Sequence, residues 1–203
     1  MQTLEYYYAL ASPWSFLGNQ KLTEIADRHN LKIDPIIINY DVMFAAAKTV
    51  PLPERPILRK EYRLLDLQRW ATFRDVEFNA EPKFYRGEVE EPNELDGALM
   101  VVAAKEEGLD SLKLAHSISR ALWAEERFPF EKSELIRIAD AEGFDGAKLW
   151  QKTNDSRIAD AYAANTQKSI DQGVFGMPFY IVGGQRYWGQ DRLELMDHVL
   201  VNG

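Results

Sequence analysis

The chain has 203 residues, a length that suits one large domain or a core domain with an insertion. Its 24 basic and 32 acidic side chains give a net charge of −8. This balance argues against a nucleic-acid partner, because phosphate binding needs clustered Lys and Arg. The sequence has no cysteine, which excludes a disulfide framework, a Cys-x-x-C oxidoreductase and a protein thiol nucleophile. Any thiol chemistry must therefore come from a bound ligand.

Neither a leader peptide nor a membrane segment is predicted. The first residues lack a basic stretch followed by an apolar one, and no apolar run approaches membrane-spanning length. We therefore expect a cytoplasmic protein with no membrane partner. The three histidines share no spacing that indicates a metal site or a catalytic triad, so no metal is expected.

The first 40 residues predict a strand, a helix and a second strand. Leu4 to Leu10 is rich in tyrosine and apolar residues, which favours a buried strand. Ser12, followed by proline, is typical of a helix start, and the apolar stripe continues to about His29. Residues 31–38 read as a strand, where Pro35 indicates an edge or an irregularity.

Residues 41 to about 169 have the apolar period of helices and contain no predicted strand. A loop over 81–93, with Pro82, Gly87 and Pro92, interrupts the block and has a length that is often functional. Helices are expected over 57–73, 94–107, 111–126, 132–142, 147–153 and 155–172.

The strand pattern returns near the end of the chain. Residues 179–182 and 185–188, joined by two glycines, predict a β-hairpin, and a last helix should run from about 191 to 201. This element order is that of an α/β thioredoxin-like domain with a large all-helical insertion. We expect residues 1–40 plus 170–203 to form the first domain and residues 41–169 the helical domain.

Ser12 lies at a turn from strand to helix, where free N–H groups and the helix dipole favour an anion. Open α/β sheets bind ligands beyond the carboxyl ends of their strands, which is where this turn should lie. The simpler alternative is an N-cap serine with no further role.

Two later segments are also candidate ligand sites. A proline follows Met177 at the entrance of a strand, and a cis peptide there would expose the Met177 backbone to an extended peptide ligand. An ordinary trans turn is the alternative. Asp191, beside the amide of Gln190, is suited to a ligand's α-ammonium group or, alternatively, to capping the last helix.

Four segments together resemble the 2-hydroxychromene-2-carboxylate isomerases, a family grouped with the kappa-class glutathione transferases and the DsbA-like branch of the thioredoxin superfamily. The resemblance covers nearly the whole chain in order and spacing. No segment is decisive alone, but four in register are specific to the family. They are Ser12 to Leu17 (SPWSFL), Asp66 to Ala71 (DLQRWA), Gly173 to Pro178 (GVFGMP) and Trp188 to Arg192 (WGQDR).

The resemblance implies a homodimeric isomerase with glutathione as its cofactor. Its substrate would be an aromatic α-keto acid, converted from cis to trans as 2-hydroxychromene-2-carboxylate is converted to trans-o-hydroxybenzylidenepyruvate. Such a reaction belongs to naphthalene-type aromatic hydrocarbon catabolism. By the same resemblance, glutathione would contact the sulfur-facing serine, the backbone before a cis-proline and the γ-glutamyl-binding segment, namely Ser12, Met177, Pro178, Trp188, Gly189, Gln190 and Asp191.

The substrate side of the site is implied by the same resemblance. Tyr85 matches an aromatic residue that contacts the organic acid, and Lys48 is the candidate for the family's substrate lysine. Arg55 or Lys60 is an alternative partner for the substrate carboxylate. Trp14, with Tyr85, would supply aromatic walls.

The reaction chemistry agrees with this resemblance. A double bond conjugated to a ketone rotates slowly, and reversible thiolate addition at the β carbon makes it a single bond. A serine hydroxyl at a helix N-terminus suits the stabilisation of that thiolate. Two alternatives stay open: a glutathione transferase that conjugates electrophilic aromatics, and a non-catalytic thioredoxin-fold peptide binder.

Overall fold

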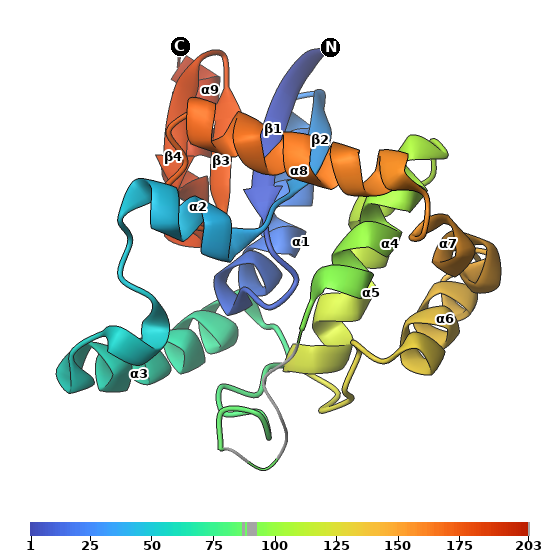
Figure 1. The fold of residues 1–203 in the computed structure, drawn as a ribbon. Helices are drawn as coiled ribbons and strands as arrows, with labels where there is room; N and C mark the ends of the chain where they lie inside the picture. The colour runs from blue at the N-terminus through green and yellow to red at the C-terminus, as the bar shows by residue number, and fades with distance from the viewer. Residues whose placement is uncertain (87, 89–92, 203) are drawn as a thin grey trace.

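The computed structural model describes residues 1–86, 88 and 93–202. The elements in chain order are β1 (Gln2–Tyr8), α1 (Pro13–Arg28), β2 (Leu31–Ile37), α2 (Tyr40–Ala47), the 3-10 turn η1 (Leu52–Glu54), α3 (Ile57–Arg74), α4 (Leu95–Glu106), α5 (Ser111–Trp123), α6 (Lys132–Ala141), α7 (Gly146–Lys152), α8 (Ser156–Asp171), β3 (Phe179–Val182), β4 (Gln185–Trp188), the 3-10 turn η2 (Gln190–Arg192) and α9 (Leu193–Asn202) (Figure 1).

The four strands form one mixed sheet in the order β2-β1-β3-β4. β1 runs parallel to β2 and antiparallel to β3, and β3 and β4 form the antiparallel hairpin that the sequence predicts. Pro35 lies in β2, which is an edge strand, so its missing N–H breaks no ladder on the outer side. The expectation of an edge at this proline is confirmed.

Helices cover both faces of the sheet, because alternate strand residues are apolar on each face. Tyr6 and Tyr180 stack at 5.4 Å between ring centroids on the face that also holds Leu22 of α1. Tyr7 points to the opposite face and packs in a second cluster with Met43 of α2. Figure 1 shows α8 crossing the front of the sheet beside α2, while both chain termini lie at the opposite end from α3.

The fold is thioredoxin-like α/β with a large helical insertion, as expected. All strands of the described residues lie outside 41–169, and the predicted helices of this block are present. Buried residues of the insertion, among them Met100 and Trp123, share one core cluster with Tyr8 of β1. The division into two domains stays a prediction. Of the predicted 81–93 loop, residues 87 and 89–92 lie outside the described residues.

The structure differs from the sequence predictions in one additional helix and at several element ends. The first strand stops at Tyr8, because the Ser12 N–H donates to the Ala9 carbonyl and closes a turn (3.2 Å). Helix α2 was not predicted as a separate helix, and Asn39 begins it by accepting from two backbone N–H groups. The last helix starts at Leu193 rather than 191, after the 3-10 turn η2.

No helix in the described part of the chain is long and apolar enough to span a membrane.

Candidate functional site

The strand register brings the three predicted ligand segments to one edge of the sheet. The carboxyl end of β1 pairs with the start of β3, where Tyr7 lies opposite Phe179. Phe179 in turn lies opposite Trp188 at the end of β4. The Ser12 turn follows β1, the Met177-Pro178 bond precedes β3, and the segment after Trp188 leaves β4. These residues, far apart in sequence, therefore meet at the same end of the sheet.

Ser12 is the N-cap of α1. Its backbone is extended (φ −84°, ψ 110°), and its Oγ accepts from the Ser15 N–H at 3.2 Å. The side chain is half-buried. A capping serine uses only an oxygen lone pair, so the hydroxyl proton is still available to donate. The cap and a ligand contact can therefore coexist, although the sequence presents them as alternatives.

The Met177-Pro178 peptide bond is cis. The Pro178 carbonyl accepts from the Gly189 N–H at 2.9 Å, which ties this loop to the end of β4. Within the described residues, the backbone of Met177 has no backbone hydrogen-bond partner. Its N–H and C=O are thus available to pair with an extended ligand.

Gly176 allows the Met177 loop to approach Trp188 closely. A Cβ at this glycine would overlap the Trp188 indole nitrogen and lie 3.0 Å from its Cε2. The indole also contacts the ring of Phe175 edge-on, with centroids 4.9 Å apart. Trp188 is nevertheless 53% exposed, so one side of the indole still faces solvent.

Asp191 and Gln190 have different surroundings. Asp191 is exposed and accepts from the Arg192 guanidinium at 2.6 Å. Gln190 is only 2% exposed, and its Oε1 accepts from Arg74 Nε at 2.7 Å. The Gln190 amide oxygen is therefore bound inside the protein by Arg74, whereas the resemblance implies that Gln190 contacts glutathione.

Asp66 of α3 lies close enough to Asp191 for the two charges to interact. Burial raises the pKa of Asp66, the positive charge of Arg69 opposes this rise, and the negative charge of Asp191 adds to it. Two neighbouring carboxylates form a favourable place for an ammonium group. Asp66 belongs to a segment that carries the family resemblance, but the sequence gives it no role. A role for Asp66 is indicated only by the structure, in which hydrogen bonds from Arg74 to Gln190 hold α3 against η2.

A cluster of arginines surrounds Tyr85. Arg63 donates to the Tyr85 hydroxyl at 3.1 Å, and its guanidinium lies 5.5 Å from the ring centroid. Burial, together with the positive charges of Arg63 and Arg59, lowers the pKa of Arg55. The predicted pair of Tyr85 and Arg55 is thus brought together, with two further guanidinium groups that the sequence analysis did not single out. An anion would relieve their mutual repulsion.

The two predicted lysines have other surroundings. Lys60 Nζ donates to the Pro53 carbonyl at 3.3 Å. Lys48 is exposed at the end of α2 in a left-handed conformation. The next residue, Thr49, donates its hydroxyl to the Phe175 carbonyl at 2.8 Å. Lys48 therefore lies in a loop attached to the cis-proline segment.

Trp14 is half-buried and packs with Leu17 and Trp70 in the cluster between α1 and α3. Part of its indole is thus accessible to an aromatic ligand. The same position also serves the packing of α1 against α3.

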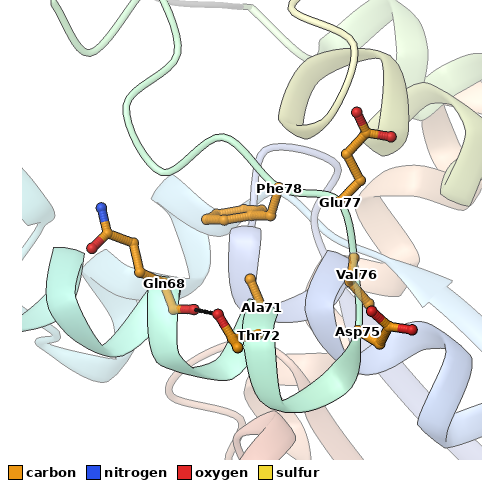
Figure 2. A pocket seen from close by; sticks show the side chains of 7 residues that line it. All are labelled: Gln68, Ala71, Thr72, Asp75, Val76, Glu77 and Phe78. Carbon is orange, nitrogen blue, oxygen red and sulfur yellow. Dashed lines mark hydrogen bonds between the residues drawn. The ribbon is translucent and has the colours of Figure 1, made fainter.

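A surface hollow of about 550 Å³ near the end of α3 is lined by other residues. Figure 2 shows the ring of Phe78 over Ala71, with Gln68 on one side and the carboxylates of Asp75 and Glu77 on the other. No residue predicted from the sequence lines it. Two carboxylates and no cation make this hollow a poor match for an organic acid.

The histidines have structural partners. His29 pairs with Asp197 at 2.7 Å, and His116 bonds Asn19 at 3.1 Å. Across residues 1–86, 88 and 93–202, no group of three or more His, Asp or Glu side chains is arranged to hold a metal ion.

The sequence model of the DsbA-like thioredoxin domain family matches residues 3–201. The chain belongs to the DsbA-like thioredoxin family. This DsbA-like chain is 24% identical to a 2-hydroxychromene-2-carboxylate isomerase of Pseudomonas putida, over 97% of the chain and 93% of the relative. It is 23% identical to glutathione S-transferase kappa 1 of Homo sapiens, over 98% of the chain and 91% of the relative.

A solved structure of a 2-hydroxychromene-2-carboxylate isomerase has the same fold, with a TM-score of 0.80 at 22% identity, and the match covers 98% of this chain and 95% of that one. The similarity along the whole chain confirms the thioredoxin-like fold with its helical insertion. It also bears out the resemblance that the four sequence segments carry.

Arg74 joins the helical insertion of this DsbA-like chain to its last helix. Its side chain is 5% exposed and donates to the Gln190 side chain, the Gln190 carbonyl (2.9 Å) and the Glu194 carboxylate (2.8 Å). This role could not be predicted from the sequence, because the partners are 116 and 120 residues away. Arg74 therefore fixes the segment that presents Asp191.

Replacement of Arg74 by leucine is expected to lower the free energy of unfolding by about 1–3 kcal/mol, because the buried amide oxygen of Gln190 loses its donor, while the Gln190 carbonyl keeps the Leu193 N–H. Urea denaturation measures this loss. Glu194→Gln is the matched control and should cost less than about 1 kcal/mol, because that carboxylate is 43% exposed. Equal losses in the two variants would show that Arg74 stabilises the fold through its surface ion pair with Glu194 and not through the buried Gln190 amide.

Proposed function

We propose that the protein is a glutathione-dependent cis-trans isomerase of an aromatic α-keto acid, of the 2-hydroxychromene-2-carboxylate type. The observation that carries the proposal is the meeting of Ser12, the unpaired Met177 backbone and Asp191 at one edge of the sheet. The isomerases and the kappa-class transferase among the relatives support an enzyme that works with glutathione.

The residues at this edge fit glutathione in three respects. The Ser12 hydroxyl proton can donate to a thiolate while its oxygen caps α1. The Met177 N–H and C=O can pair with an extended tripeptide. Asp191, with Asp66 nearby, provides negative charge for the α-ammonium group of the γ-glutamyl residue. Trp188 and Gly189 would flank that residue, and Gln190 would act by holding the segment in place.

When bound, glutathione supplies a sulfur nucleophile. Its reversible addition turns the substrate's double bond into a single bond that can rotate. The chain itself must keep that sulfur ionised and orient the acid. Ser12 and the N-terminus of α1 perform the first task, because both favour negative charge.

Arg55 is our candidate partner for the substrate carboxylate. Its Nε donates to the Val50 carbonyl at 2.9 Å, and the rest of the guanidinium has no hydrogen-bond partner among the described residues. Tyr85 lies in the same cluster and would contact the aromatic ring. Lys60, whose Nζ donates to the Pro53 carbonyl at 3.3 Å, is the alternative partner. Lys48, beside the cis-proline loop, would approach the acid from the glutathione side.

Calorimetry with glutathione tests the proposal first. The isomerase and the transferase both require binding, whereas a binder of unrelated peptides does not, so the absence of glutathione binding would reject both enzyme functions. Product analysis then separates them. Full recovery of glutathione indicates an isomerase, and a stable aromatic adduct indicates a transferase. Naphthalene-type catabolism and a homodimer stay predictions from the family resemblance.

Asp191→Ala is expected to weaken glutathione binding by about 1–3 kcal/mol, the range for the loss of a charge-assisted hydrogen bond. Calorimetric titration gives the dissociation constant directly. Asp27→Ala is a suitable control, because it removes one exposed negative charge from the far part of α1. Unchanged affinity in Asp191→Ala would limit Asp191 to its ion pair with Arg192.

A further inference from the structure

Glu94 is the one charged residue that is buried in the described part of the chain, at 6% exposure. It lies directly before α4, at the N-cap position. An acidic residue at this position would ordinarily accept from the first N–H groups of its own helix. Glu94 makes no such capping bond. Its carboxyl group is directed elsewhere, which calls for another role.

The Glu94 carboxyl binds the turn that carries Ser12. Its Oε2 accepts from the Ala11 N–H at 2.7 Å. Ala11 is 83 residues away in sequence and is the immediate neighbour of Ser12. A buried group of the helical insertion therefore holds the backbone of the turn at the proposed sulfur site.

The groups facing Glu94 do not neutralise its charge. Burial raises the pKa of the hydroxyls of Tyr8 of β1 and Tyr162 of α8, and the nearby charge of Glu94 raises both further. The charged residue that acts on Glu94 is Asp41 of α2, which is also negative. In the described residues, Glu94 Oε1 and the Tyr8 hydroxyl have no hydrogen-bond partner. Burial raises the pKa of Glu94 to about 7, so both charge states are accessible near neutral pH.

We infer that Glu94 is a positioning residue that holds the Ser12 turn and sets the acidity of a thiol bound beside Ser12. The inference rests on the proposed function. In its neutral form, Glu94 holds the turn without adding negative charge, which favours a thiolate next to Ser12. In its ionised form, it repels that thiolate across the low-dielectric interior. The two ionisations oppose each other, and by linkage each shifts the other equally.

Glu94→Gln separates anchoring from charge, because the amide oxygen can still accept from the turn while the charge is lost. The experiment titrates thiolate ultraviolet absorbance against pH in the glutathione complexes of wild type and Glu94→Gln. We expect the thiol midpoint of the variant to be lower by about 0.5–1 pH unit. Its affinity for glutathione should change less than about threefold, because the anchor is kept.

Asp41→Asn is the matched control. Asp41 is exposed, and among the described residues it makes no hydrogen bond to the turn, so its removal should move the thiol midpoint by less than about 0.3 unit. A shift as large as that of Glu94→Gln would overturn the inference, because any negative charge in the region would then act alike.

A measurement on the wild type covers the case in which Glu94→Gln does not fold. Carboxyl-carbon NMR follows the glutamate that titrates near neutral pH. Glutathione should raise its midpoint, whereas S-methylglutathione, which cannot ionise at sulfur, should not.

The possible failures are distinguishable. If glutathione does not bind the wild type at all, the proposed function falls and this inference falls with it. If glutathione binds but the thiol midpoint is the same in folded Glu94→Gln, only the role of Glu94 is overturned. Equal midpoints of Glu94 with glutathione and S-methylglutathione would overturn it in the same way.

Discussion

Ser12→Ala is expected to lower turnover of the glutathione-loaded protein by a factor of about 10–100, equivalent to about 1.4–2.7 kcal/mol. The Ser12 oxygen accepts from the Ser15 N–H, so its proton is available to stabilise a thiolate. Alanine removes both contacts. Glutathione should still bind through Met177 and Asp191. The kinetic loss should appear together with a higher midpoint in the thiolate titration.

Two variants distinguish the thiolate role of Ser12 from its capping role. Asp145→Ala removes an equivalent cap, that of α7, where the carboxylate accepts from the Lys148 N–H at 2.9 Å. It should cost about 0.5–2 kcal/mol of stability and leave the thiol midpoint unchanged. Ser12→Thr keeps a hydroxyl and should retain most of the activity. A folded Ser12→Ala with the wild-type thiol midpoint would reduce Ser12 to a helix cap.

The free energy of unfolding of the wild type is expected to fall relative to that of Glu94→Gln as pH rises. Glu94 has a pKa of about 7 in the folded chain against a reference of 4.5. Between these values the folded state binds more protons than the unfolded state, so stability decreases with increasing pH. Over this whole range the wild type is expected to lose about 3 kcal/mol of stability relative to Glu94→Gln. The contribution is fully present below the lower pKa and is lost above the higher one.

Urea denaturation of both proteins at several values between pH 4 and pH 8 measures this effect. Other titrating groups are common to the two proteins and cancel in the comparison. A difference in free energy that does not change over this range would contradict a buried, proton-binding Glu94. The stability measurement needs no glutathione and is therefore independent of the proposed function.

Local signals in the sequence predicted most of the fold. The serine and proline at the start of α1, the two glycines of the hairpin and the helical period of the insertion each act within a few residues. Helix α2 was missed, because it is short and apolar on most sides, so that its period is indistinct. The end of β1 was misplaced by two residues, because Ala9 and Leu10 are as apolar as the strand before them.

The candidate site was only partly predictable. Ser12, Met177 and Asp191 could be proposed from the sequence, because each stands next to a strand or helix boundary with a recognisable pattern. Arg74 and Glu94 were not, because their partners lie 83 to 120 residues away and the contacts depend on packing between the insertion and the sheet. Gln190 is a residue that the sequence did single out but whose actual contact depends on the fold. The sequence places it in a candidate ligand segment, but its amide oxygen accepts a hydrogen bond from Arg74, which only the fold brings near.

Isomerisation with a small amount of glutathione tests the central claim most directly. The experiment follows the cis-to-trans conversion of a hydroxychromene carboxylate by absorbance, with glutathione far below the substrate concentration, and then counts the thiol that remains. We expect many substrate molecules to be converted per glutathione, all glutathione to be recovered, and no conversion with S-methylglutathione, because the chain has no cysteine of its own. Equal conversion without any thiol, or consumption of one glutathione per product, would contradict a glutathione-dependent isomerase.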